Sequence, residues 1–306
     1  FHTNKKSEDL NISIPTLKPF YHGVASGDPL TDRVIIWTRV TPTQDHDIDV
    51  NWTVADDVSF KNIIRSGNVT ASAKHDYTVK VDVTDLLPGT RYYYRFNALG
   101  AFSITGITKT MPSENVDSLK FVVLTGSNYE HGYFNAYGRV ADRKDIDAVI
   151  HTGDYIYEYP SGKYGSSSFD PAPDRSVIPD RELVELEDYR LRYSHYRLDE
   201  NLRRAHQNHP FLVVWDDHEI ANDCYVDGAQ NHQPEMEGDW EKRKNAAKTA
   251  YFEWMPIRGE KVYRTISSGP LAKLFLLDER LAGRTKQLKK DDPELNDCNR
   301  TILGTE

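Results

Sequence analysis

Two segments of the sequence place metal-ligand or acid–base side chains directly after short apolar runs. The run Ala-Val-Ile leads into Asp154 and Tyr157, and the run Phe-Leu-Val-Val-Trp leads into Asp217 and His218. A short apolar run bounded by turn residues is typical of a buried parallel strand. Open α/β sheets bind ligands at the carboxyl ends of such strands. Either segment alone is better explained by a solvated loop carboxylate or a helix cap, but together they indicate a metal site on one sheet edge.

Two further predicted strands also end in polar or small residues. Residues 119–124 lead into Gly126, Ser127 and Asn128, and the apolar run at 274–277 ends in Asp278. If these strands belong to the same sheet, their ends are candidates for the same site. We therefore count these four residues as additional site candidates.

Carboxylates and a phenolate are hard oxygen ligands, and they suit ferric iron, calcium, magnesium or manganese better than copper. The phenol of Tyr157 is best matched to Fe³⁺, which lowers a phenol pKa. His218 could protonate a leaving group or hydrogen-bond a developing oxyanion, although a structural histidine is the alternative. Two cations that share Asp154 would hold a phosphate ester and activate a water molecule.

The chain divides into two kinds of pattern. After a polar arm at residues 1–18, short strands separated by turn residues predict a β-sandwich. The segment from Leu87 to Tyr92 resembles the tyrosine corner of fibronectin type III domains, in which Tyr92 would hydrogen-bond back to the backbone. A polar, proline-containing stretch predicts a domain boundary at 112/113. Residues 1–112 would then be the arm and the sandwich.

Beyond this boundary, strands alternate with helices, which predicts an α/β domain over residues 113–306. We expect helices at 135–143 and 181–207 and a third helix that begins after an Asp239 cap. The Ser-, Gly- and Pro-rich loop at 160–180 is long enough to be functional.

Composition limits the possible partners. The chain has 306 residues and a formal net charge of −9, which argues against a nucleic-acid groove. No apolar run is long enough to cross a membrane. Cys224 and Cys298 do not form a C-x-x-C pair, so a thiolate zinc site is not expected.

The longest motifs resemble those of the PhoD family of alkaline phosphatases and phosphodiesterases. They are residues 23–29 (GVASGDP), 128–133 (NYEHGY), 151–159 (HTGDYIYEY), 214–219 (VWDDHE) and 251–256 (YFEWMP). The resemblance implies an N-terminal fibronectin-like domain, followed by a metallophosphatase-type β-sandwich flanked by helices. It also implies a phosphate-ester substrate, a site with Fe³⁺ and Ca²⁺, and a periplasmic or extracellular location.

The resemblance also implies roles for individual residues. Asp154 would bridge metals, Tyr157 would bind iron, Asp217 would be a further ligand, and His218 would stand at the place of the family's catalytic histidine. Cys224 and Cys298 are usually absent from the family, so their joint appearance suggests a disulfide if the chain is exported.

Two departures from the family pattern affect these expectations. Gly126 stands where the family has a cysteine iron ligand, although Ser127 or a water molecule could substitute. The chain also ends before a family segment that carries a Gly-Asp-x-His ligand motif, so we expect the sheet and the site to be incomplete. We expect the 306-residue chain to hydrolyse esters weakly or not at all. The alternative is a noncatalytic relative that binds a phosphorylated or glycan ligand.

Overall fold

The largest sheet joins strands from both halves of the chain in the computed structural model, which describes residues 15–164 and 175–304. Its strand order is β5-β2-β1-β11-β10-β9. These strands are β5 (Thr78–Val83), β2 (Val34–Arg39), β1 (Val24–Gly27), β11 (Pro210–Val213), β10 (Ala148–His151) and β9 (Phe121–Leu124). β1, β11, β10 and β9 run parallel to one another. β2 pairs antiparallel with β1, and β5 pairs antiparallel with β2.

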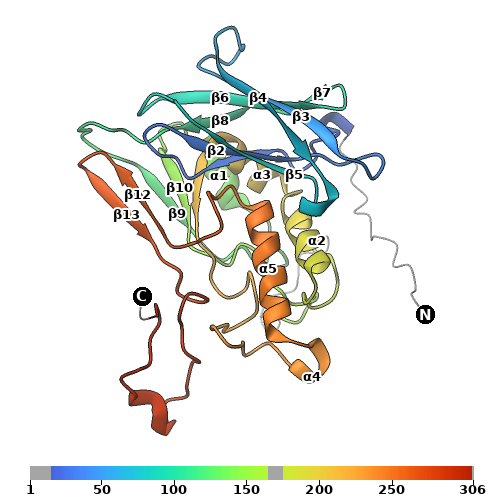
Figure 1. Ribbon diagram of the computed structural model, residues 1–306, viewed down its shortest axis with the longest axis vertical. Coiled ribbons are helices and arrows are strands. Elements are labelled where there is room, and N and C mark those ends of the chain that lie inside the picture. Colours follow the sequence, from blue (N-terminus) through green and yellow to red (C-terminus); the bar gives the residue numbers. More distant parts are fainter. Residues whose placement is uncertain (1–14, 165–174, 305–306) are drawn as a thin grey trace.

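A second sheet packs over strands β1, β2 and β5 of the first (Figure 1). It has the order β4-β3-β6-β7, and β8 also pairs with β6. Its strands are β4 (Ile63–Ala71), β3 (Ile48–Ala55), β6 (Arg91–Ala98), β7 (Ala101–Phe102) and β8 (Gly106–Lys109). Along β6, Tyr92, Tyr94 and Phe96 alternate with more exposed residues, and they fill the core between the sheets. The N-terminal half is therefore a β-sandwich, as predicted.

One layer of this sandwich is continuous with the sheet of the C-terminal half. β1 pairs with β11 through Ser26 and Pro210 and through Gly27 and Phe211. The two halves nevertheless have separate main hydrophobic clusters. The domain boundary at 112/113 stays a prediction, but the shared sheet shows that the halves are joined by more than a linker.

The tyrosine corner is confirmed, because the Leu87 amide donates a hydrogen bond to the Tyr92 hydroxyl at 2.8 Å. The disulfide prediction is wrong for this structure, in which both cysteines are free thiols. Cys224 is buried beneath the loop that carries Asp217, whereas Cys298 is exposed in the C-terminal segment.

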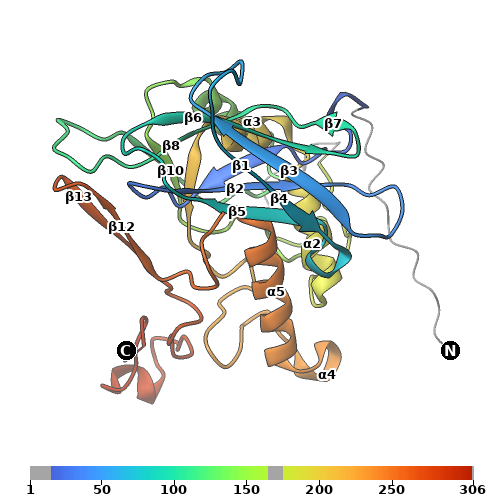
Figure 2. The ribbon, with the colours of Figure 1, turned by 45° about the horizontal axis from the view of Figure 1, so that its top comes forward.

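Helices cover the C-terminal part of the large sheet (Figure 2). They are α1 (Asn135–Asp142), α2 (Leu186–Tyr196), α3 (Glu200–Asn208), α4 (Pro234–Glu237) and α5 (Trp240–Trp254), with 3-10 turns η1 (Pro15–Leu17), η2 (Ala73–His75) and η3 (Pro293–Asn296). The Asp239 side chain accepts hydrogen bonds from the first amides of α5, as predicted. None of the helices in the described ranges is both long and apolar enough to cross a membrane.

The prediction of one helix over 181–207 is wrong, because α2 and α3 are separate. The chain leaves helical geometry before Asp199, whose side chain accepts a hydrogen bond from the Leu202 amide at 3.0 Å and caps a new helix. Three tyrosines of α2, Tyr189, Tyr193 and Tyr196, are fully buried in the main cluster, which agrees with their interpretation as core residues.

The strand expected before Asp278 exists as β13 (Ala272–Leu276), but it pairs only with β12 (Arg264–Ser268). This hairpin stands beside the large sheet and is not part of it (Figures 1 and 2). Residues 1–14 of the expected arm and residues 165–174 of the expected long loop lie outside the described residues. The predicted mixed α/β architecture with a β-rich N-terminal half is confirmed.

Candidate metal centre

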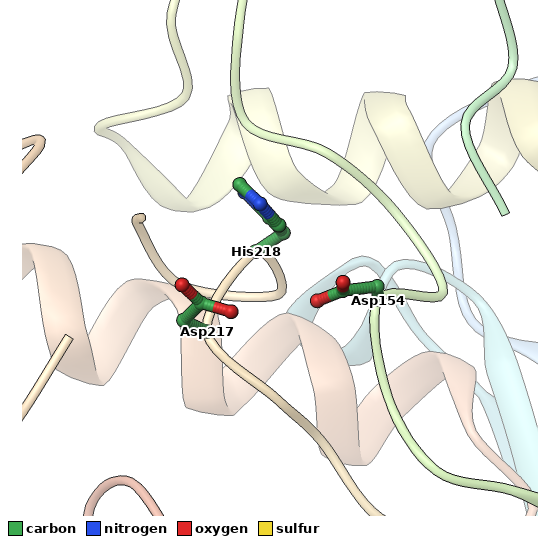
Figure 3. A group of neighbouring side chains, drawn as sticks. All are labelled: Asp154, Asp217 and His218. Carbon is green, nitrogen blue, oxygen red and sulfur yellow. The ribbon is translucent and has the colours of Figure 1, made fainter. Parts of the chain in front are cut away.

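The loops that follow β10 and β11 bring three of the sequence-predicted side chains together. The two strands are parallel neighbours, and His151 pairs with Val213 at their carboxyl ends. One ligand atom each of Asp154, Asp217 and His218 lies within 4.8 Å of the others. Figure 3 shows the Asp154 carboxylate pointing toward the loop that carries Asp217 and His218. The edge of a parallel sheet thus gathers residues that are about 60 positions apart in the sequence.

The turn after β10 has an unusual backbone. Gly153 has φ +104°, and a Cβ at this position would lie 2.3 Å from the Asp216 amide nitrogen. Asp154 itself has φ +55°, a conformation that costs energy in a residue with a side chain. Glycine is therefore required for the close approach of the two loops, and the strained aspartate is held at the point where they meet.

Asp154 has the properties of an incomplete cation ligand. Burial raises the pKa of its carboxyl group to about 6, and the nearby charges of Asp216 and Asp217 act in the same direction. Within the described part of the chain, nothing hydrogen-bonds to its buried Oδ1. A hard cation between Asp154 and Asp217 would satisfy this oxygen and favour its ionised form. The donor set therefore fits a metal ion of this class.

Asp217 is held from two sides. Its Oδ2 accepts a hydrogen bond of 2.6 Å from the Asp223 amide, and its Oδ1 lies 3.3 Å from Nη2 of Arg280. The same guanidinium donates from Nε to Oδ1 of Asp216 at 2.6 Å. Arg280 thus binds two consecutive carboxylates at the rim of the site and orients the Asp217 side chain.

His218 is oriented by a buried carboxylate. Its Nδ1 lies 2.8 Å from Oε2 of Glu158, and because a carboxylate only accepts, Nδ1 carries the hydrogen. Glu158 is fully buried, and its Oε1 accepts from the Asn222 amide at 2.6 Å and from the Asn231 side chain at 2.9 Å. This arrangement fixes the imidazole plane and leaves Nε2 as the nitrogen that Glu158 does not engage.

The same carboxylate controls the charge of the histidine. Burial alone would lower the pKa of His218, but the hydrogen bond and negative charge of Glu158 outweigh burial and raise the pKa to about 9. Burial in turn would raise the pKa of Glu158, but the hydrogen bond from His218 lowers it. The buried pair is therefore an imidazolium and a carboxylate at neutral pH.

Tyrosines pack around His218. The Tyr157 ring stacks on the imidazole at a centroid distance of 4.4 Å, and Tyr164 meets it edge-on at 4.8 Å. The Tyr157 hydroxyl donates to Oδ2 of Asp154 at 3.4 Å, so this phenol borders the carboxylate pair. Burial raises the pKa of Tyr157, so the phenol keeps its proton unless a cation stabilises the phenolate.

The loop after β9 contributes through one position. Gly126 has φ +69°, and a Cβ there would lie 3.6 Å from the Tyr157 hydroxyl. The Ser127 hydroxyl instead faces the buried Tyr137 and His151 side chains, so it is not available as the substitute ligand that the sequence suggested. The Asn128 side chain accepts from the Glu130 amide at 3.1 Å. Position 126 is thus the one of these three whose side chain would border the site.

Asp278 is not part of the cluster. Its Oδ1 accepts hydrogen bonds from the Trp215 indole at 2.9 Å and from the amides of Arg280 and Leu281. It therefore stabilises the turn after β13, which is consistent with the separation of the β12–β13 hairpin from the large sheet.

Sequence reasoning did not assign roles to three residues that support the cluster: Glu158, Glu219 and Arg280. Glu158 and Glu219 lie inside the motifs at 151–159 and 214–219, so their positions were visible in the sequence. Their partners lie in other loops, and no local spacing indicates such contacts. Arg280 lies two residues after Asp278, and no motif or spacing in the sequence marks it as a site residue.

Comparisons with known proteins agree with the resemblance drawn from the motifs, which is confirmed. The family described as PhoD-like phosphatase matches residues 121–306, and the PhoD-like phosphatase N-terminal domain matches residues 8–112. Alkaline phosphatase D of Bacillus subtilis (strain 168) is 37% identical over 310 residues, covering 94% of this chain and 52% of that protein. A solved structure of PhoD superposes with a TM-score of 0.85 at 34% identity, covering 97% of this chain and 59% of that one. The chain therefore spans about half the length of the curated relative that it matches.

Proposed function

We propose that this chain, which belongs to the PhoD-like phosphatase family, carries the site of a metal-dependent hydrolase of phosphate monoesters or diesters. The observation that carries the proposal is the cluster of Asp154, Asp217 and His218 on neighbouring strand ends. The similarity to alkaline phosphatase D supports the phosphatase class. A periplasmic or extracellular location is part of the same proposal.

Asp154 and Asp217 would hold the metal, with Asp154 shared between two ions and Tyr157 beside it as the ligand for iron. Bound Fe³⁺ and Ca²⁺ would supply Lewis-acid polarisation of the phosphoryl oxygens and activation of a water molecule. The chain's own residues support an oxygen-rich site. Gly126 supplies no side chain next to Tyr157, so we propose weak iron affinity and a site that takes other hard cations more readily.

His218 would act as the general acid. Its Nδ1 is engaged by Glu158, and in the metal-free chain the hydrogen bond and charge of Glu158 raise its pKa to about 9, which favours the proton-donating form. We therefore assign it to proton donation to the leaving oxygen, although its ring lies close enough to the carboxylates to be a ligand. Glu158 would position the ring and hold the positive charge before the proton is transferred.

The test is hydrolysis of p-nitrophenyl phosphate and bis(p-nitrophenyl) phosphate by the chain with added Ca²⁺, Mn²⁺ or Fe³⁺. We expect slow turnover, below about 1 per second, that requires the cation and is lost in Asp154→Asn and His218→Asn. Asp147→Asn is the control, because this acid pairs with Lys109 at the amino end of β10, away from the cluster, and should leave turnover unchanged. Turnover that survives both chelation and Asp154→Asn would contradict the proposal.

The second candidate function is a noncatalytic domain that binds a phosphorylated or glycan ligand. The absence of a side chain at Gly126 favours it, because the site then lacks one anionic group beside Tyr157. A chain that binds the cation and inorganic phosphate but hydrolyses neither ester would support this second candidate.

A further inference from the structure

We propose that Glu219 is the positioning residue that sets the separation of the two metal-ligand loops, an inference that rests on the proposed role of Asp154 and Asp217. Glu219 is fully buried. Its Oε2 accepts hydrogen bonds from the amide of Asp154 at 3.1 Å and from the amide of Asp216 at 2.9 Å. Its Oε1 accepts from the amide of Tyr155 at 2.6 Å.

These contacts join the loop after β10 to the loop after β11 through one carboxylate. One oxygen atom, Oε2, accepts from the amide of Asp154, which is one of the proposed ligands. The same atom accepts from the amide of Asp216, the residue directly before the other proposed ligand, Asp217. The positions of the two ligand side chains therefore depend on the same atom. All three N–H donors are satisfied only when Glu219 is a carboxylate, because the O–H of a neutral acid would face one of them. Hydrogen bonds from amides to an ionised carboxylate are shorter and stronger than neutral ones, so this link is stiff.

The backbone at this junction needs such a link. The β10 ladder ends at His151, so the amides of Asp154 and Tyr155 have no strand partner. Asp154 also holds a positive φ that its side chain disfavours, and Gly153 packs directly on the Asp216 amide. Three amides that converge on Glu219 stabilise this conformation and keep the Asp154 carboxylate aimed at Asp217.

The role of Glu219 differs from that of the other buried glutamate at the site. Glu158 contacts the His218 ring and controls its orientation and charge. Glu219 makes its hydrogen bonds to backbone amides, so it controls ligand geometry and not proton transfer. Loss of a residue that holds metal ligands in place commonly weakens metal binding about 10- to 100-fold.

Glu219→Gln is a sharp perturbation because it preserves shape and changes only the acceptors. A glutamine offers one carbonyl oxygen, so either orientation of its amide places an NH₂ group against at least one of the three N–H donors. Asp188→Asn is the matched control. Asp188 is also buried and accepts hydrogen bonds from two backbone amides, Val184 at 3.2 Å and Glu185 at 3.0 Å, but it caps α2 away from the cluster.

The experiment measures Mn²⁺ affinity by calorimetry and unfolding by denaturant for the wild-type chain and both variants. We expect the Mn²⁺ dissociation constant to rise about 10- to 100-fold in Glu219→Gln. In Asp188→Asn, it should stay within about twofold while stability falls. A dissociation constant within twofold of wild type in Glu219→Gln would overturn the inference. Equal weakening in both variants would also overturn it, because the effect would then be a general loss of stability.

A second variant and a second measurement ensure that the inference about Glu219 is either supported or refuted. If Glu219→Gln does not fold, Glu219→Asp replaces it, because the shortened carboxylate keeps its charge but cannot reach all three amides. If the wild-type chain binds no Mn²⁺, the proposed function fails, and amide hydrogen exchange then tests Glu219 alone. Faster exchange at Asp154, Tyr155 and Asp216 in the variant would support the positioning role, and unchanged exchange would refute it.

Discussion

Replacing Glu158 with glutamine should change the acid–base behaviour of His218 more than any other single substitution near the cluster. In the metal-free chain, Glu158 is the main reason why the pKa of His218 is raised to about 9 from its ordinary 6.5. A rise of this size corresponds to on the order of 3 kcal/mol in favour of the charged imidazole. Without the negative charge, burial is the dominant influence, so in Glu158→Gln the pKa should fall to 6.5 or below.

The assay is an NMR pH titration of the His218 ring, which does not require the chain to be active. At pH 7.5, about 97% of the wild-type ring should be protonated, against about 10% or less in the variant. Because His218 binds protons more tightly when folded, its stabilising contribution is complete below pH 6.5 and is lost as the pH rises through 9. Glu130→Gln, at a buried glutamate that contacts the Gly162 amide, is the control. A wild-type ring that titrates near 6.5, or an unchanged value in Glu158→Gln, would refute this reasoning.

Three other predictions concern the site and the joined halves. The metal-free chain should lose stability as the pH rises from about 6.5 to 8, because the folded-state pKa of His218 is raised to about 9 from its ordinary 6.5. Thermal unfolding should show this trend, and added Ca²⁺ should reverse it; a flat profile would contradict it. Gly126→Cys should increase iron content and visible absorption. The positive φ at this position should lower the stability of the variant by about 1–2 kcal/mol. Unchanged iron content would contradict the placement of position 126 at the border of the site. Proteolysis in the exposed segment 113–118 should cut the chain but leave the halves associated on gel filtration, since they share a sheet; separation would show that the shared strands contribute little.

Much of the site was visible in the sequence because its signals are local. A buried parallel strand reads as a continuous apolar run, and the residue after it is placed at the sheet edge by topology alone. This is why Asp154 and Asp217 could be predicted to meet. The same logic failed for Asp278, because an apolar run does not reveal whether its strand joins the main sheet or a separate hairpin.

The supporting residues could not be predicted, because their roles depend on contacts between loops. Glu158 contacts a histidine 60 residues further along the chain, and Glu219 contacts amides 64 and 65 residues before it. Helical periodicity likewise continued across the break between α2 and α3, where the cap at Asp199 outweighs the pattern. The pairing of N-terminal strands with the C-terminal sheet has no sequence signal, because β1 reads as an ordinary short strand.

The central claim is that Asp154 and Asp217 together hold a cation, and Mn²⁺ binding followed by electron paramagnetic resonance tests it directly. The wild-type chain should bind Mn²⁺, and Asp154→Asn and Asp217→Asn should each weaken binding at least about tenfold, because each removes one of the two carboxylates. Asp147→Asn should bind like wild type, because its carboxylate pairs with Lys109 at the amino end of β10, away from the cluster. Wild-type affinity in Asp154→Asn, or an equal loss in Asp147→Asn, would contradict the account.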